Sequence, residues 1–151
     1  MMDTADVIIV GSGASGLFNA LFLPKDYKVI VITKKEVEES DSFLAQGGIS
    51  ALKNPEDYDS YFEDTMKAGH YENDKGAVEK MIKESPQIIQ DLKDFGVRFD
   101  LKDGEIEFTR EGGHSTFRIL HHEDLTGKEI ASHLYEEAKK RDNITIMENC
   151  T

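Results

Sequence analysis

A run of small residues near the N-terminus has the spacing of a loop that binds the pyrophosphate of a dinucleotide. The loop consists of Gly11, Ser12, Gly13, Ala14, Ser15 and Gly16. The first glycine permits a tight turn, the second lets the backbone approach a pyrophosphate, and the third lets a helix pack closely on a strand. The N-terminus of that helix offers N–H groups and the positive end of its dipole to phosphates. The loop therefore predicts a nucleotide cofactor site.

The residues after the next apolar run leave the identity of that cofactor open. An acidic residue usually stands there and binds the adenosine ribose, whereas this chain has Thr33, Lys34 and Lys35. Lys34 would suit the 2′-phosphate of NADP. Alternatively, a flavoprotein could bind the ribose in another way, or the two lysines could simply be solvated. An NADP-binding regulatory module is therefore one interpretation of this region.

A segment with little periodicity, residues 34–57, has the composition of an ordered loop that faces a ligand. Its central residues are Asp41, Ser42, Phe43, Leu44, Ala45, Gln46, Gly47 and Gly48. Adjacent glycines let backbone N–H groups approach a flat ring or a phosphate. The amide of Gln46 can both donate and accept at a heteroaromatic edge.

A second polar loop, residues 109–115, carries side chains that could bind a substrate. The guanidinium of Arg110 can hold a carboxylate with two hydrogen bonds. The carboxylate of Glu111 can pair with an ammonium group, and His114 can transfer a proton near neutral pH. A solvated connection between strands would have a similar composition, so the residues alone leave both interpretations open.

An α/β fold is needed to position these loops. Apolar runs at 7–10 and 27–33 predict buried parallel strands, and a helix is predicted between them at 17–23. Strand, glycine loop, helix and strand form the βαβ unit of a Rossmann-like fold. A third buried strand is predicted at 144–147, after a helix at 126–140.

The middle of the chain predicts more helices and a small β-hairpin. Helices are expected at 57–68 and 74–84, followed by a separate helix that begins with Ser85 as N-cap and Pro86 in its first turn. Lys102–Gly104 predicts the turn of a hairpin between strands at 97–99 and 106–108.

Composition excludes several classes of function. The 151 residues include 18 basic and 30 acidic ones, so the formal net charge of −12 argues against nucleic acid and anionic membranes as partners. A single cysteine and the lack of an HExxH motif argue against a metal site. Without a signal peptide or a membrane-spanning apolar stretch, a cytoplasmic protein is expected.

The order and spacing of the motifs resemble the succinate dehydrogenase/fumarate reductase flavoprotein family. The matching segments are residues 6–17, 29–34, 40–51, 109–115 and 118–127. The resemblance implies FAD, with its pyrophosphate at the glycine loop and contacts from residues 12–15. Lys34 matches a family lysine, and residues 41–48 match the loop along the flavin. Succinate dehydrogenases attach FAD covalently through a histidine where this chain has Asp41, so non-covalent FAD is implied.

Residues 109–115 most resemble the branch of the family that oxidises L-aspartate to iminoaspartate, a step toward quinolinate and NAD biosynthesis. The resemblance implies that Glu111 binds the substrate ammonium and that Arg110 and His114 help to position the substrate. Oxygen or fumarate would reoxidise the flavin, and quinolinate synthase is a candidate partner. A dehydrogenase of the fumarate reductase or succinate dehydrogenase type is the alternative within the family.

The resemblance also implies an incomplete domain. Residues 1–151 contain only three predicted strands of the parallel sheet, whereas nucleotide-binding sheets normally have more. The capping domain, the C-terminal helical domain and the main catalytic arginine of the family would lie beyond Thr151. We therefore expect the N-terminal part of an FAD-binding domain, inactive by itself.

Overall fold

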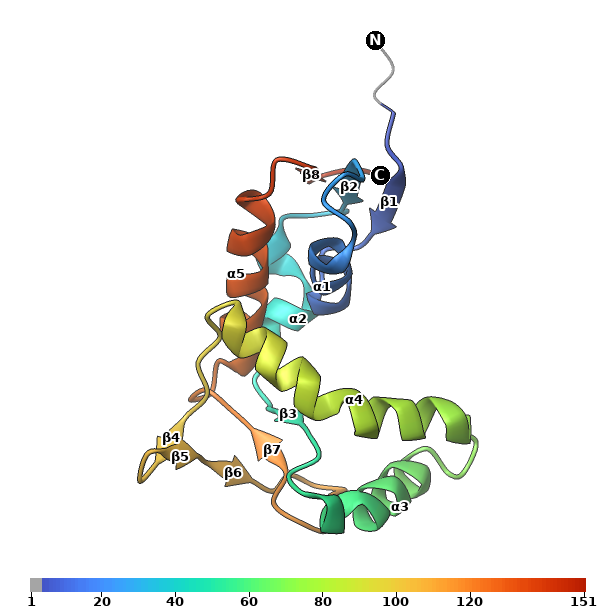
Figure 1. Ribbon diagram of the computed structural model, residues 1–151, viewed down its shortest axis with the longest axis vertical. Coiled ribbons are helices and arrows are strands. Elements are labelled where there is room, and N and C mark those ends of the chain that lie inside the picture. The colour runs from blue at the N-terminus through green and yellow to red at the C-terminus, as the bar shows by residue number, and fades with distance from the viewer. Residues whose placement is uncertain (1–3) are drawn as a thin grey trace. The chain divides into compact units, whose positions relative to one another are not determined.

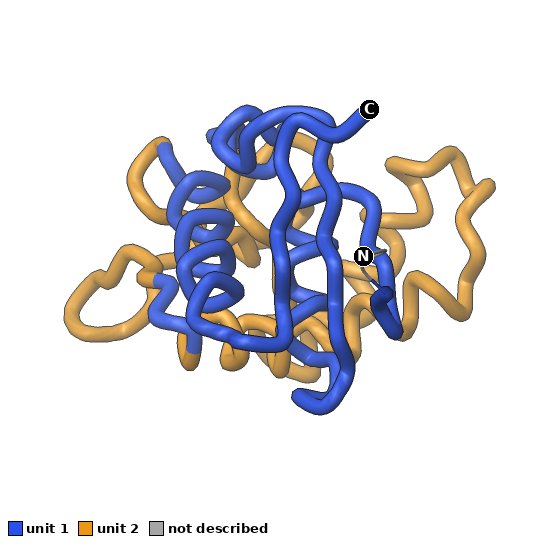
Figure 2. Tube along the Cα trace, turned by 90° about the horizontal axis from the view of Figure 1, so that it is seen from above, with its two compact units in different colours: residues 1–46, 95–97, 125–151 blue, residues 47–94, 98–124 orange. Residues whose placement is uncertain are grey.

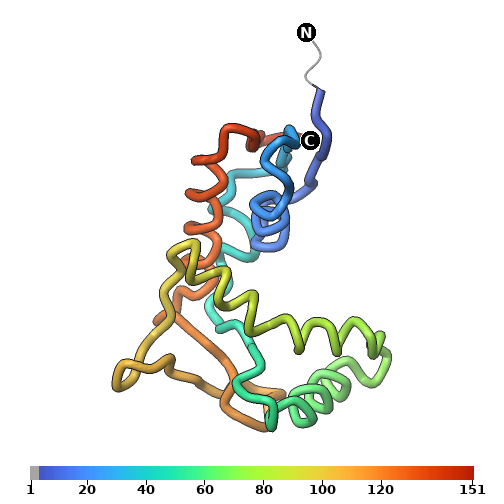
Figure 3. The backbone as a smooth tube through the Cα atoms, viewed as in Figure 1, coloured from blue at the N-terminus to red at the C-terminus, as the bar shows by residue number. Residues whose placement is uncertain are grey.

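The computed structural model describes residues 4–151, which form two compact units (Figure 2). Of these residues, 4–46, 95–97 and 125–151 form unit 1, and 47–94 and 98–124 form unit 2. The chain leaves unit 1 after Gln46 and returns to it finally at Leu125, a path that can be followed by colour in Figure 3. Among the described residues, no helix has both the length and the apolar character that a membrane span requires.

Unit 1 is built on a parallel sheet. Its strands β1 (Val7–Val10), β2 (Val29–Ile32) and β8 (Ile144–Met147) lie in the order β1-β2-β8. The helices α1 (Ala14–Phe22) and α5 (Thr126–Lys139) pack against each other (Figure 1). The sheet and α1 meet in a cluster of apolar side chains: Ala20, Val29 and Val31, with Ile9, Leu23, Ile144 and Ile146 around them. The predicted Rossmann-like α/β fold with its βαβ unit is confirmed.

The prediction that all three parallel strands are buried is wrong for two of them. Only β2 is buried along most of its length, because it lies between the other two. In β1, Ile8 is 62% exposed and Val10 is 81% exposed, and Met147 of β8 is also exposed. Among the described residues, helices pack against only one face of these edge strands. The side chains on the other face are therefore exposed. A continuous apolar run therefore does not by itself indicate burial on both faces.

The segment predicted to be irregular, residues 34–57, contains short elements. In unit 1 these are a 3₁₀ turn, η1 (Val37–Glu39), and the short helix α2 (Asp41–Leu44). Ser40 caps α2, because its hydroxyl accepts a hydrogen bond from the N–H of Phe43 at 3.3 Å. In unit 2 the segment continues with β3 (Ile49–Ser50) and η2 (Pro55–Asp57).

Unit 2 combines two helices with short antiparallel strands. The helices α3 (Tyr58–Ala68) and α4 (Lys75–Asp94) share a core formed by Tyr61, Met66, Val78 and Ile82. The strands β6 (Phe108–Thr109) and β7 (Ile119–Leu120) pair with each other, and β7 also pairs with β3. This sheet connects the two ends of the polar loop to the segment that precedes α3.

A hairpin forms at the predicted turn, but the predicted strands are wrong, because residues 97–99 lie outside any strand and the first strand begins only at Leu101. Its strands are β4 (Leu101–Lys102) and β5 (Glu105–Ile106), joined by Asp103 and Gly104. Both turn residues have positive φ, 54° and 87°, as a two-residue type I′ turn requires. Phe108, expected at the end of the hairpin, pairs with Leu120 of β7 instead.

Ser85 and Pro86 do not begin a new helix, contrary to the prediction, because α4 continues through both of them. A proline removes one N–H donor from a helix and leaves the carbonyl four residues earlier without its partner. The hydroxyl of Ser85 donates to this carbonyl, that of Ile82, at 2.7 Å. The same hydroxyl accepts from the N–H of Leu52 at 2.8 Å. Ser85 thus satisfies the carbonyl that the proline leaves unpaired, and it attaches α4 to the segment after β3.

The glycine loop of unit 1 has the conformation that its spacing predicts. Gly11 has φ +110°, in the region that favours glycine. A Cβ added at Gly16 would lie 2.0 Å from the carbonyl oxygen of Gly11. Because carbon and oxygen atoms cannot approach so closely, α1 can begin where it does only if residue 16 is glycine.

Replacing Gly16 by alanine tests this constraint. We expect G16A to lower the free energy of unfolding by about 1–3 kcal/mol, because the helix must shift away from the loop. The matched control is G47A, since a Cβ at Gly47 would meet nothing within 4 Å. Urea denaturation of both variants measures the difference. Equal stability of the two variants would contradict the proposed clash.

Candidate functional site

The two predicted cofactor-binding segments meet in unit 1 at a hollow of about 450 Å³. It opens at the carboxyl ends of β1 and β2, where open α/β sheets bind their ligands. The lining residues are Val10, Gly11, Ser12, Gly13, Ile32, Thr33, Lys34, Ser40, Asp41, Ser42 and Cys150. The structure therefore brings together the glycine loop, Lys34 and the start of the second loop, although they are distant in sequence.

Hydrogen bonds attach the glycine loop to the end of β2. The N–H of Gly11 donates to the carbonyl of Ile32 at 2.8 Å, and the hydroxyl of Ser12 donates to that of Thr33 at 2.9 Å. Ser12 is buried, and its hydroxyl is engaged in this contact. Ser12 would therefore offer its backbone to a ligand.

Ser42 connects the second loop to the start of α1. The N-cap residue of α1 is Gly13, which has no side chain to accept from the first N–H groups of the helix. The hydroxyl of Ser42 accepts from the N–H of Ala14 at 3.0 Å in its place. A Cβ at Gly13 would lie 3.0 Å from the same hydroxyl oxygen. The absence of a side chain at Gly13 thus gives Ser42 room to reach the helix.

The lining of the hollow fits the phosphates of a dinucleotide. The start of α1 provides N–H groups and the positive end of a helix dipole, and Lys34 adds a cation at the end of β2. Asp41 contributes a carboxylate that can accept hydrogen bonds but repels phosphates. Phosphates would therefore be best accommodated between the glycine loop and Lys34.

The rest of the second loop is held by α5. The carbonyl of Ala45 accepts from the N–H of Gly127 at 3.0 Å, and a Cβ at Gly127 would lie 2.2 Å from the carbonyl oxygen of Ser42. The ammonium of Lys128 lies 5.9 Å from the ring centre of Phe43. Leu44 and Gln46 are exposed.

The two adjacent glycines have different structural roles. A Cβ at Gly48 would lie 2.2 Å from the Cγ2 atom of Ile119 and 2.4 Å from the carbonyl oxygen of Leu120. Packing against β7 therefore explains Gly48 without any ligand. A Cβ at Gly47 would meet nothing within 4 Å, so Gly47 retains an exposed backbone that a flat ring could approach.

The candidate substrate residues lie in unit 2 on a turn between β6 and β7. The N–H of His114 donates to the carbonyl of Glu111 at 3.2 Å, and Gly113 has φ +88°. The side chain of Glu111 is exposed. The guanidinium carbon of Arg110 lies 5.8 Å from the ring centre of Phe117. The turn thus keeps Glu111 and His114 close in space, whereas Arg110 makes a cation–π contact with an aromatic ring.

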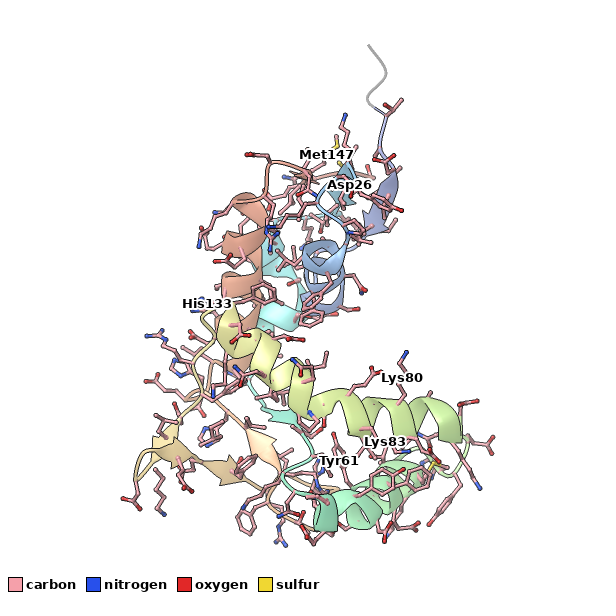
Figure 4. The ribbon with its side chains drawn as sticks, viewed as in Figure 1. Asp26, Tyr61, Lys80, Lys83, His133 and Met147 are labelled. Atoms are coloured by element: carbon pink, nitrogen blue, oxygen red, sulfur yellow. The ribbon has the colours of Figure 1, made fainter. Side chains whose placement is uncertain are left out.

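Arg118, which was not singled out from the sequence, is the fully buried centre of a polar cluster in unit 2. Its guanidinium binds Asp57 through Nε at 2.9 Å and Nη2 at 2.8 Å, and Asp64 through Nη1 at 2.6 Å. Further contacts reach Ser60 at 2.8 Å and Nδ1 of His114 at 3.1 Å. The ring of Tyr61, labelled in Figure 4, lies 4.8 Å from its Cζ atom.

The cluster controls the protonation of its carboxyl groups. Hydrogen bonds from Arg118 lower the pKa of Asp57 to about 2, with further bonds from Ser60 and Thr116. Burial alone would raise the pKa of Asp64, but bonds from Ser115 and Arg118 outweigh that effect and lower it. Both aspartates are therefore ionised at neutral pH and compensate the charge of the buried arginine.

Two sequence signals point to this cluster in retrospect. Arg118 interrupts an apolar run between Phe117 and Ile119, where a charge needs a buried partner. Asp57 and Asp64 are seven residues apart, which places them on one face of a helix. Among residues 4–151, no three or more side chains of His, Cys, Asp or Glu are grouped to hold a metal ion.

Comparison with known proteins shows the family to which the chain belongs. Residues 6–151 match the family model described as FAD binding domain. The chain is 44% identical over 150 residues to the L-aspartate oxidase of Clostridium perfringens and 47% identical over 145 residues to that of Clostridium acetobutylicum. These alignments cover 99% and 95% of this chain but only 34% and 33% of the relatives. The chain thus spans about a third of their length.

Solved structures of related flavoproteins have the same fold. Escherichia coli quinol fumarate reductase FrdA superposes with a TM-score of 0.89 at 25% identity, over 96% of this chain and 26% of that one. Mycobacterium smegmatis Sdh1 in complex with UQ1 gives 0.84 at 28% identity, over 97% of this chain and 28% of that one. The resemblance to the succinate dehydrogenase/fumarate reductase flavoproteins is confirmed.

The depressed pKa of Asp57 predicts how unit 2 responds to acid. A carboxyl group whose pKa is lower in the folded state stabilises the fold at neutral pH and loses that contribution as pH falls from its ordinary value of 3.8 to about 2. We expect a loss on the order of 1–2 kcal/mol across this window. Urea denaturation at several pH values measures it. The free energy of unfolding of the D57N variant should fall less steeply with decreasing pH. That of the D59N variant, changed at an exposed position, should fall as in the parent chain. A parallel response of D57N and the parent would exclude Asp57 as the source.

Proposed function

The chain belongs to the FAD-binding domain family and has FAD as its cofactor, and from this premise we propose that it forms part of an enzyme that oxidises L-aspartate to iminoaspartate. The observation that carries the proposal is the identity of 44–47% to L-aspartate oxidases over nearly the whole chain. Because the chain spans about a third of those relatives, the activity is proposed for a polypeptide that also carries the remaining two thirds.

The residues around the hollow of unit 1 would hold the cofactor. The backbone of Ser12, Gly13 and Ser15 would meet the pyrophosphate, while the N–H of Ala14 is bonded to Ser42. Lys34 would compensate phosphate charge, and the loop 41–48 would follow the flavin. When bound, FAD supplies an acceptor for two electrons. Asp41 stands where related enzymes use a histidine for a covalent bond, and a carboxylate cannot form that bond, so the proposed attachment is non-covalent.

The turn in unit 2 would recognise the substrate. L-aspartate carries an ammonium group and two carboxylates, and its oxidation removes a hydride from Cα and a proton from nitrogen. Glu111, an exposed carboxylate, would bind the ammonium. His114 and Arg110 would bind or position the carboxylates. Arg110 lies over the ring of Phe117 at a cation–π distance. Its planar guanidinium can bind a carboxylate through two parallel hydrogen bonds.

Fumarate reduction or succinate oxidation is the alternative function. The TM-score of 0.89 to quinol fumarate reductase means that the fold by itself does not separate these activities. Glu111 favours L-aspartate, because succinate and fumarate have no ammonium for it to bind. The higher identity to L-aspartate oxidases favours the same assignment.

The proposal also includes a cellular role. Oxygen or fumarate would reoxidise the flavin, and iminoaspartate would enter quinolinate and NAD biosynthesis in the cytoplasm. Quinolinate synthase is the candidate partner, since it would consume iminoaspartate. The names of the relatives support the substrate. These further assignments follow from the family resemblance alone.

Titration of the chain with FAD and with NADPH tests the cofactor part of the proposal. We expect tighter binding of FAD, and a flavin absorption band that passes into the supernatant when the protein is denatured. In G13V, a branched side chain at the site of the Ser42 contact should weaken FAD binding. Tighter binding of NADPH would instead favour a regulatory module, and flavin retained after denaturation would exclude non-covalent attachment.

Replacement of Glu111 tests the proposal that this residue binds the ammonium of L-aspartate. The chain would be completed with the remaining sequence of the Clostridium perfringens relative, and the 151-residue chain alone serves as an inactive control. We expect E111Q to lower kcat/KM for L-aspartate roughly 10- to 100-fold, since a charge-assisted bond to the ammonium is lost. Fumarate reduction should change little. E107Q is the matched variant outside the turn, and an equal loss in both variants would remove the proposed role of Glu111.

A further inference from the structure

We infer that Arg118 fixes His114 as the tautomer with its proton on Nε2, so that His114 donates a hydrogen bond to a carboxylate of the substrate. Arg118 is thereby a positioning residue that acts through His114. The tautomer follows from contacts within unit 2 alone. The assignment of its acceptor rests on the proposed function, and the two parts are tested by separate measurements.

The contact between Arg118 and His114 determines which ring nitrogen carries the hydrogen. Nη1 of Arg118 lies 3.1 Å from Nδ1 of His114. A guanidinium has only donors, so Nδ1 must accept and cannot carry a hydrogen. The single hydrogen of a neutral imidazole then resides on Nε2. Turning the ring over would place a C–H group against the guanidinium donor and lose the bond.

Arg118 can impose this choice because its own position is fixed. Asp57 binds Nε and Nη2 together, a two-point contact that sets the plane of the guanidinium. Asp64 binds Nη1, and the ring of Tyr61 lies 4.8 Å from Cζ. The side chain is fully buried, so water does not compete for these bonds. His114 therefore meets a fixed donor.

The same cluster fixes the turn that carries Glu111. Asp64 accepts hydrogen bonds from both the N–H and the hydroxyl of Ser115, at 2.7 and 2.8 Å. His114 is held on one side by Arg118 and on the other by the carbonyl of Glu111. Ser115 is thus anchored directly to α3, and His114 is connected to α3 through Arg118. The cluster restrains the backbone at Glu111 as well as the imidazole.

The ring of His114 borders a second hollow of about 470 Å³ in unit 2. Lys67, His70 and Ser115 also line it, together with Asp64, whose carboxylate is bonded to Arg118 and Ser115. Because Nδ1 points to the buried arginine, the Nε2 edge is the one available to a ligand. Of the polar groups of L-aspartate, the ammonium only donates, so an N–H on Nε2 can pair only with a carboxylate. Lys67 supplies a positive charge beside it.

Nitrogen-15 NMR of the 151-residue chain tests the tautomer without cofactor or activity. Spectra would be recorded above the pH range in which imidazoles titrate, and H114Q would identify the resonances of His114. The internal control is His121, whose Nδ1 lies 3.1 Å from a carboxylate oxygen of Asp100 and must carry a hydrogen. We expect the hydrogen on Nε2 in His114 and on Nδ1 in His121. A hydrogen on Nδ1 of His114 would overturn the inference.

The R118K variant tests the role of Arg118. A lysine keeps the charge but cannot bind Asp57 and His114 with one planar group, so His114 should become a mixture of tautomers. Circular dichroism would verify that the variant is folded. If it does not fold, the spectrum of the parent chain decides. A folded R118K variant with an unchanged tautomer would exclude Arg118 as the determinant.

The substrate contact is tested in the completed polypeptide described above. H114Q retains an N–H donor near the position of Nε2, whereas H114F removes it. We expect H114F to raise KM for L-aspartate roughly tenfold with a smaller effect on kcat, and H114Q to recover most of the loss. A parental KM in H114F would overturn the carboxylate contact. If the completed polypeptide with His114 does not oxidise L-aspartate, the proposed function and the substrate contact both fail, while the NMR result still decides the tautomer.

Discussion

The backbone of α1 approaches the carbonyl of Gly11 so closely that only a hydrogen atom fits at the Cβ position of Gly16. This contact determines where the helix begins and directs its first N–H groups at the hollow beyond β1 and β2. Ser42 then reaches the helix start only because Gly13 also lacks a side chain. The geometry of the candidate phosphate site in unit 1 therefore depends on backbone packing before any ligand is considered.

The main constraint on unit 2 is different, because a positive charge is buried there. Removing a guanidinium from water is costly unless each donor finds an acceptor. Two aspartates, a serine and an imidazole surround Arg118, and the aspartates come from the start and the middle of one helical segment. This arrangement ties the polar turn to α3 at several points. A loop that carries the candidate substrate-binding side chains is thereby held by the same interactions that stabilise the unit.

Local patterns predicted two backbone features well. The glycine spacing predicted the βαβ unit, and Lys102–Gly104 predicted the hairpin turn, because each depends on backbone constraints within a few residues. The predictions were less successful where contacts between residues far apart in sequence determine the structure. Ser85 and Pro86 have the pattern of a helix start, yet the hydroxyl of Ser85 satisfies the carbonyl that the proline leaves unpaired. Burial of β1 and the partners of Arg118 depend on elements far away in sequence, which no local pattern contains.

The exposed side chains of β1 have a consequence for how the chain behaves in solution. In the described residues β1 is an edge strand, with Ile8 and Val10 facing water beside unpaired backbone groups. Such an edge is a template for pairing with a strand of another molecule. The net charge of −12 opposes that encounter, because like-charged copies repel each other over a distance set by the ionic strength. Salt shortens this distance, so the resistance of the chain to association through β1 depends on the ionic strength.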